Sequence, residues 1–302
     1  MRRQKLRARG ELFAAGLLFG LMAALARRGS LGGDAFTGPQ MAFARMALGT
    51  GMTLALFRLR PGTFRPVNVR LLVTRGLLGG AAVVLYFLAL ARIPAGEATL
   101  LNNTFPVIAT VISFWTLEER PTLHIGVALC IATLGMLLVV GDGSIPTSLG
   151  WGEAAAIASA FIGAGAVTSI RALRATDNAF TIFFAFSLGG MAVSLPFATT
   201  AWPPPGPVWL LALGVGVLSF AAQVLMTDAY GALTVPEAAV WQQLTPVASY
   251  LWALLLLGER LSAAGAVGVL LGIGGVAYGT VLGHRAPLRP VPADDSARSL
   301  QP

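Results

Sequence analysis

Long apolar runs, separated by short stretches of charged and turn-forming residues, follow one another along almost the whole chain. A helix of about 20 apolar residues is long enough to cross the hydrocarbon core of a membrane. The pattern predicts ten such helices, spans 1 to 10, and therefore an all-α integral membrane protein. Their approximate bounds are 11–28, 36–57, 70–91, 95–116, 123–141, 151–170, 178–199, 207–230, 235–257 and 262–282.

The composition and the placement of charge agree with a membrane protein. Only 11% of the 302 residues are charged and 56% are hydrophobic, whereas soluble domains carry about 25% charged residues. Most of the 21 Lys and Arg residues lie in the loops of the side that also holds both chain ends. The positive-inside rule places that side, and both termini, in the cytoplasm. The net charge of +8 is thus explained by topology and lipid headgroups, and no nucleic-acid partner is expected.

The two ends of the chain need separate interpretation. The basic and then apolar start resembles a secretory signal peptide, but the repeat described next requires it as an uncleaved first span. The segment 283–302 is rich in Pro, Arg and Asp, and we expect a disordered cytoplasmic tail.

An internal repeat relates positions that are 140 residues apart. Pro106 superposes on Pro246 and Glu97 on Glu237, and the segment Leu117-x-Glu119-Arg120 matches Leu257-x-Glu259-Arg260. The two units are residues 1–141 and 150–282, with five spans each. Because five is odd, the second unit enters the membrane in the opposite sense, which is the inverted repeat typical of secondary transporters.

The segments "ARIPAGEATLLNNTFPV" and "TVPEAAVWQQLTPV", with "LEER" and "LGER" after them, resemble the EamA-type module of the drug/metabolite transporter superfamily. The resemblance covers roughly residues 11 to 282. It implies a ten-span secondary carrier of small organic solutes, more often an exporter than an importer. It implies neither an enzymatic activity nor a cofactor.

The stretches "NNTFPV" and "QQLTPV" carry the main candidate site. A proline releases the backbone carbonyl four residues before it, and those carbonyls belong to Asn102 and Gln242. Span 4 descends from one membrane face and span 9 rises from the other, so the two polar stretches converge near the midplane. We expect them to line a cavity, although such amides also serve simply to hold helices together.

The predicted site residues extend beyond these two stretches. Arg45 lies in the middle of span 2, where an arginine needs an anion, either from the protein or from the solute. Arg75 lies nearer the cytoplasmic end of span 3, and we expect it to reach the headgroups. The predicted helix-kinking or gating residues are Pro106 and Pro246. The predicted substrate-binding residues are Arg45, Tyr86, Asn102, Asn103, Thr110, Gln223, Trp241, Gln242, Gln243 and Tyr250.

Two further features each have two interpretations. Glu97 and Glu237 are candidates for proton coupling, but each also stands in the first turn of a proline-started helix, where a carboxylate complements the helix dipole. The four glycines of span 10, at 268, 272, 275 and 279, allow close packing. That packing is expected either within the bundle or across a homodimer.

The resulting hypothesis is a secondary active transporter in the bacterial inner membrane. It would move a small metabolite or drug-like solute by alternating access, with its site between spans 4 and 9. A lipid-carrier flippase on the same fold is an alternative. An intramembrane enzyme acting on lipid-linked substrates is a weaker one, because the ionisable residues inside the spans are scattered singly.

Overall fold

The computed structural model describes residues 2–29, 36–90, 92–93, 98, 101–141, 150–199, 201–257 and 262–282. Within these residues every regular element is a helix. The elements are α1 (Arg2–Gly29), α2 (Gly38–Leu59), α3 (Val69–Leu90), α5 (Phe105–Thr116), α6 (Leu123–Gly141), α7 (Trp151–Leu173), α8 (Ala179–Ser194), the 3₁₀ turn η1 (Leu195–Phe197), α9 (Val208–Ala229), α10 (Val235–Gln242), α11 (Leu244–Leu257) and α12 (Ala263–Leu282).

The observed helices follow the predicted spans with three differences. The first is that α1 begins at Arg2, well before the predicted start near residue 11. The helix of span 4 is interrupted, so that α5 forms only its second part, and span 9 is divided into α10 and α11. Among the described residues, five helices are both long and apolar enough to cross a membrane: α1, α3, α7, α9 and α12. The helices α5, α6 and α8 provide shorter apolar segments.

Local sequence signals set where several helices begin. Thr37 and Thr234 each accept a hydrogen bond from a backbone N–H three residues later, and the residues at those positions, Gln40 and Glu237, complete two capping boxes. Asn178 caps α8 by accepting from the backbone N–H of Thr181. These side chains satisfy N–H groups that would otherwise lack partners at a helix start.

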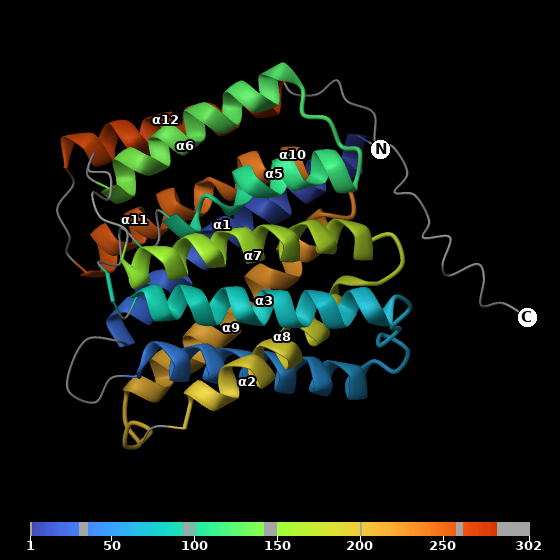
Figure 1. Cartoon of the computed structure of the whole chain (residues 1–302), viewed down its shortest axis with the longest axis vertical. Coiled ribbons are helices and arrows are strands. Elements are labelled where there is room, and N and C mark those ends of the chain that lie inside the picture. The colour runs from blue at the N-terminus through green and yellow to red at the C-terminus, as the bar shows by residue number, and fades with distance from the viewer. Residues whose placement is uncertain are drawn as a thin grey trace, which may run out of the picture.

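The order of the helices in the bundle is shown in Figure 1. The pair α6 and α12 lies along one edge, and α2, α8 and α9 lie toward the opposite edge. Helix α3 packs on α7 and α8, whereas α9, its counterpart in the repeat, packs on α1 and α2. This exchange of partners between the halves is what a two-fold relation between two five-helix units predicts.

Glycines bring several of these helices into backbone contact. At Gly135 of α6, a Cβ atom would lie 2.5 Å from the backbone nitrogen of Gly272 and 2.6 Å from the carbonyl oxygen of Gly268 in α12. At Gly189 of α8, a Cβ atom would lie 2.5 Å from the carbonyl carbon of Gly76 in α3. Such contacts are closer than any real Cβ atom makes, so these positions require glycine.

The glycine face of α12 is therefore occupied within the bundle. Gly275 approaches the backbone of Ala132 and Gly279 approaches the side chain of Ala128, both on α6. Of the two interpretations of this face, the structure shows packing inside one chain. A homodimer through the remaining surface of α12 stays a prediction.

The packing of α6 on α12 leads to a matched test. Gly135→Ala should lower the unfolding temperature, because overpacking a backbone contact costs about 1–3 kcal/mol. Gly126→Ala in the same helix should leave it unchanged or raise it slightly, since a Cβ at Gly126 meets nothing within 4 Å and alanine favours helix. Thermal unfolding in detergent measures both. Equal effects of the two substitutions would contradict the proposed contact.

Candidate functional site

Both polar stretches interrupt their helices at equivalent places. In the first half, residues 101–102 are helical, residues 103–104 form a turn, and α5 begins at Phe105. In the second half, α10 ends at Gln242, and Gln243 separates it from α11. Residue 103 corresponds to residue 243 in the repeat of 140 residues, so the predicted interruption occurs at the same position in each half.

The two interrupted helices meet in the bundle. Helix α5 packs against α10, and Pro106 and Pro246 are both buried. The face of α5 that carries Pro106, Thr110 and Ser113 is the buried one. The chain therefore turns its polar faces toward other helices rather than toward lipid.

The amides of the second break keep unused hydrogen-bonding capacity. Gln242 Nε2 donates to Tyr230 Oη at 2.9 Å, and Gln243 Nε2 donates to Thr133 Oγ1 at 3.3 Å. The Oε1 atoms of both glutamines are buried and have no partner. Two oriented acceptors are thus available where α10 and α11 meet, which is unusual because buried polar atoms normally find partners.

At the first break, the side-chain amide of Asn102 is hydrogen-bonded to a neighbouring helix. Asn102 Nδ2 donates to Ser159 Oγ of α7 at 2.8 Å, and Ser159 Oγ donates to the carbonyl oxygen of Ala82 in α3 at 2.7 Å. Asn102 therefore joins α7 and α3, as the helix-joining interpretation predicts. Asn103 lies in the turn itself and is partly buried.

Two other predicted site residues lie within local packing. Thr110 Oγ1 donates to the carbonyl oxygen of Pro106, inside its own helix. Tyr250 Oη accepts from the backbone N–H of Ser262 at 3.3 Å, and its ring covers Gly265 at the start of α12. The structure does not bring Tyr250 to the helix breaks.

Three other predicted site residues lie on α2, α3 and α9: Arg45, Tyr86 and Gln223. Arg45 is partly buried and interacts electrostatically with Tyr86. Gln223 is 5% exposed, and its Nε2 atom has no hydrogen-bond partner. Arg45 and Tyr86 therefore lie near each other, and all three predicted residues are on other helices than the amides of the breaks.

The expectation for Arg75 was wrong. Its side chain is 3% exposed, and its Cζ lies 4.4 Å from the ring centroid of Phe186 in α8. The side chain turns into the bundle because Gly79, one turn farther along α3, leaves room for Nη1. An arginine followed four residues later by glycine is the sequence signal that the headgroup interpretation overlooked.

A charged network closes one end of the bundle. Arg171 Nε donates to Glu119 Oε1 at 2.9 Å, and the backbone N–H of Val235, at the start of α10, donates to Glu119 Oε2 at 2.7 Å. Lys5 Nζ lies 3.1 Å from Glu237 Oε1. The sequence marks Glu119 only as part of the repeated segment, because its partners are distant in the chain.

Burial opposes the ionised form of Glu119 in this ion pair. Burial raises the pKa of the Glu119 carboxyl, although the Val235 N–H and Arg171 oppose that rise. The loss of water thus outweighs the attraction to the guanidinium, as is common for buried pairs. The contact is specific, but it adds less to the closed arrangement than its short distance suggests.

Glu237 has a structural part in the same network. Its backbone N–H donates to Thr234 Oγ1, and its carboxylate accepts from the backbone N–H of Thr234. This is the helix-start interpretation of the sequence, with Lys5 as an added partner. Proton coupling by Glu237 stays a prediction, and Glu97 lies outside the described residues, as do Glu259, Arg260 and the segment 283–302.

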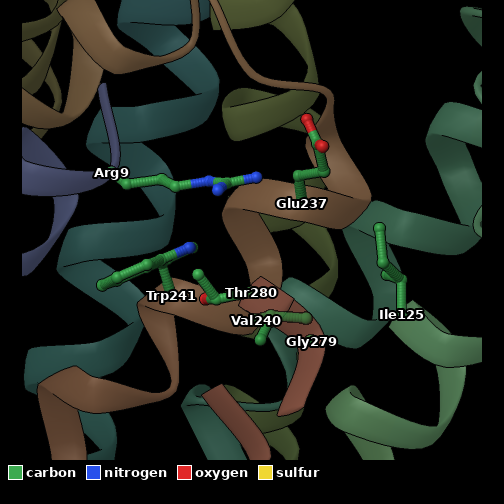
Figure 2. Close-up of a pocket in the computed structure, with 7 residues that line it drawn as sticks. All are labelled: Arg9, Ile125, Glu237, Val240, Trp241, Gly279 and Thr280. Atoms are coloured by element: carbon green, nitrogen blue, oxygen red, sulfur yellow. The ribbon is translucent and has the colours of Figure 1, made fainter. Parts of the chain in front are cut away.

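A small pocket lies beside Glu237 at this end of the bundle. Figure 2 shows Arg9 of α1 extending toward Glu237, with Trp241 one turn below on α10. The predicted site residue Trp241 therefore faces the charged end rather than the break that follows it. The residues that line the pocket are Arg9, Ile125, Glu237, Val240, Trp241, Gly279 and Thr280.

Comparison with known proteins gives a consistent family match. The model of the EamA-like transporter family matches residues 11–141 and again residues 150–280. A relative named Pseudopaline exporter CntI, from Pseudomonas aeruginosa, is 29% identical over 258 residues, which cover 84% of this chain and 89% of the relative. An uncharacterized transporter of Helicobacter pylori is 24% identical over 234 residues, covering 72% and 76%.

A solved structure shares the fold. That structure is titled "Crystal structure of protein". It superposes on this chain with a TM-score of 0.79 at 23% sequence identity, and the match covers 92% of this chain and 98% of the solved one.

The bond between Asn102 and Ser159 leads to a double-mutant test. Asn102→Ala and Ser159→Ala should each destabilise the protein, and the double variant should cost less than their sum, with a coupling of about 0.6 kcal/mol. Thermal or chemical unfolding in detergent measures the three variants. Strictly additive effects would show that the amide does not hold α7.

Proposed function

Because the chain belongs to the EamA-like transporter family, we propose that it is a secondary active transporter that exports a small organic solute across the cytoplasmic membrane. The family and the relatives are transporters, which favours transport over catalysis. The solute site is located where the interrupted helices of the two halves meet. The observation that carries this proposal is the pair of helix breaks, 140 residues apart, with the unpaired Oε1 atoms of Gln242 and Gln243 beside the second.

The proposed topology has ten spans in two inverted halves, with both termini in the cytoplasm. The exchange of partners between α3 and α9 and the distribution of Lys and Arg residues support it. In this topology the charged network faces the cytoplasm, since it contains the start of α1. Residues 1–141 and 150–282 then form the two units that move relative to each other.

The charged network serves as the cytoplasmic gate in this proposal. Glu119, which follows α5, holds both Arg171 of α7 and the start of α10. It therefore connects the two interrupted helices at one side of the membrane. Because desolvation offsets part of the attraction in this buried pair, a change in the solute site is able to open it, as alternating access requires.

Transport can be tested directly in proteoliposomes. Pseudopaline, which the Pseudomonas relative is named for exporting, is the first solute, followed by amino acids, organic acids and nucleosides. Gln243→Leu and Asn103→Leu should each reduce transport of the active solute by about tenfold or more, because an unpaired polar group on the solute costs 1–3 kcal/mol. Gln4→Leu, on an exposed residue of α1, is the control.

The outcomes separate the site from the function. If both Gln243→Leu and Asn103→Leu transport the solute as fast as the wild type, the proposed solute site would be contradicted. Failure of the wild type to move any of these solutes above empty liposomes would remove the transport proposal.

The gate can be tested by cysteine labelling. Cys130 is the only cysteine of the chain and is first replaced by serine, and Thr227, which is buried in α9, is replaced by cysteine. Glu119→Gln should increase labelling by an impermeant thiol reagent from the cytoplasmic side about tenfold, since it leaves Arg171 buried without its counter-ion.

A matched control uses the same substitution at an exposed pair. Glu11→Gln removes the ion pair with Arg7, whose side chain is 75% exposed, and exposed pairs contribute little. Labelling should stay at the level of the parent. Equal labelling in Glu11→Gln and Glu119→Gln would contradict a gate at Glu119.

A further inference from the structure

Arg75 is held inside the bundle by the shape of its own helix. Arg75, Gly79, Ala82 and Tyr86 follow spacings of 4, 3 and 4 residues, so they form one face of α3. The side chain of a helical residue normally points toward the helix start. Here Nη1 lies beside Gly79, one turn in the opposite direction. The guanidinium thus turns away from the nearer helix end, where it would reach water.

The second guanidinium belongs to Arg45 of α2. Arg45 interacts electrostatically with Tyr86, which is on the same face of α3, and with Arg75 itself. Two like charges in an environment of low dielectric repel each other strongly. Both Nε atoms are buried without a hydrogen-bond partner. This arrangement costs free energy unless an anion joins it.

The described part of the chain supplies no such anion. None of its carboxylates lies within ion-pair distance of Arg45 or Arg75. The protein does pair other buried or half-buried cations, because Glu119 binds Arg171 at 2.9 Å and Asp228 binds Arg174 at 2.8 Å. The two arginines of the bundle interior therefore differ from the cations at the charged end.

Helix α9 and the residue that follows it carry further polar groups. Gln223, Thr227 and Tyr230 follow spacings of 4 and 3 residues, which place them on one helix face, and Tyr230 interacts electrostatically with Arg75. Gln223 Nε2 and Thr227 Oγ1 are buried and have no partner. Tyr230 in turn accepts from Gln242, so the face is connected to the break between α10 and α11.

We propose that Arg45 and Arg75 bind the carboxylate groups of an organic acid, and that such acids are the class of solute carried. Guanidinium groups suit this task because their planar donors bind carboxylates in pairs. Gln223 and Thr227 offer an N–H and a hydroxyl to the same ligand. This inference deepens the proposed transport function and rests on it, but the binding step can be tested alone.

The test measures ligand-dependent stability of the full chain in detergent, which requires no transport. Citrate and succinate should raise the unfolding temperature by about 3 °C or more at saturation, because a ligand that binds only the folded state stabilises it. Neutral succinamide should have no effect, and sulfate at equal ionic strength should have a smaller one. Arg45→Gln and Arg75→Gln should each weaken the acid effect by about tenfold or more.

Two controls identify where the acids act. Arg70→Gln removes a positive charge from an exposed residue of the same helix and should leave the acid effect unchanged. Without ligand, Arg75→Met should raise the unfolding temperature, since it removes an uncompensated buried charge. A fall would show that Arg75 is structurally paired and would overturn the proposal.

The remaining outcomes are decisive as well. The proposal is overturned if no acid stabilises the wild type, if sulfate or succinamide acts equally, or if the effect survives in both Arg45→Gln and Arg75→Gln. If acids bind but are not transported in proteoliposomes, the acid-binding site would be supported and the transport proposal contradicted. If a neutral solute is transported and no acid raises the unfolding temperature, the transport proposal would be supported and the acid-binding site contradicted.

Discussion

The need to satisfy backbone groups away from water constrains both interrupted helices. In the hydrocarbon region an unpaired N–H or carbonyl costs several kcal/mol, so irregular backbone is tolerated only where protein or a cavity surrounds it. At the first break, Thr104 N–H bonds to the carbonyl oxygen of Leu101, which the Thr104 hydroxyl also contacts at 2.7 Å. At the second, Gln243 N–H bonds to the carbonyl oxygen of Val240. Both breaks must therefore lie inside the bundle, and the packing of α5 on α10 follows.

The same constraint separates what the sequence could predict from what it could not. Spans, breaks and the repeat depend on local patterns, such as the prolines at 106 and 246 and the amides before them. The helix bounds and the equivalent breaks at residues 103 and 243 agree with those patterns. The partner of each side chain depends on helices far apart in the chain. Nothing local shows that Asn102 bonds to Ser159, or that Tyr250 lies over Gly265.

Glycines link the local sequence patterns to the contacts between distant helices. Two close helix approaches between the halves depend on residues without a side chain, Gly135 on Gly272 and Gly189 on Gly76. Hydrocarbon chains are as apolar as leucine, so helices in a membrane associate through close packing and polar bonds. Gly79 serves a different purpose, because the space it leaves is filled by a guanidinium of its own helix. Identical residues in the sequence thus support either packing or a polar site.

The charged residues of the protein fall into two groups, one that stabilises the fold and one that we assign to function. At the end of the bundle, carboxylates neutralise buried or half-buried cations, and that end is held closed by contacts between distant helices. In the interior, Arg45 and Arg75 lack such partners among the described residues. Proteins commonly lose stability where a site must bind something that arrives from outside. An uncompensated charge is favourable only when its counter-ion is the ligand, and for a transporter that counter-ion must also be able to leave.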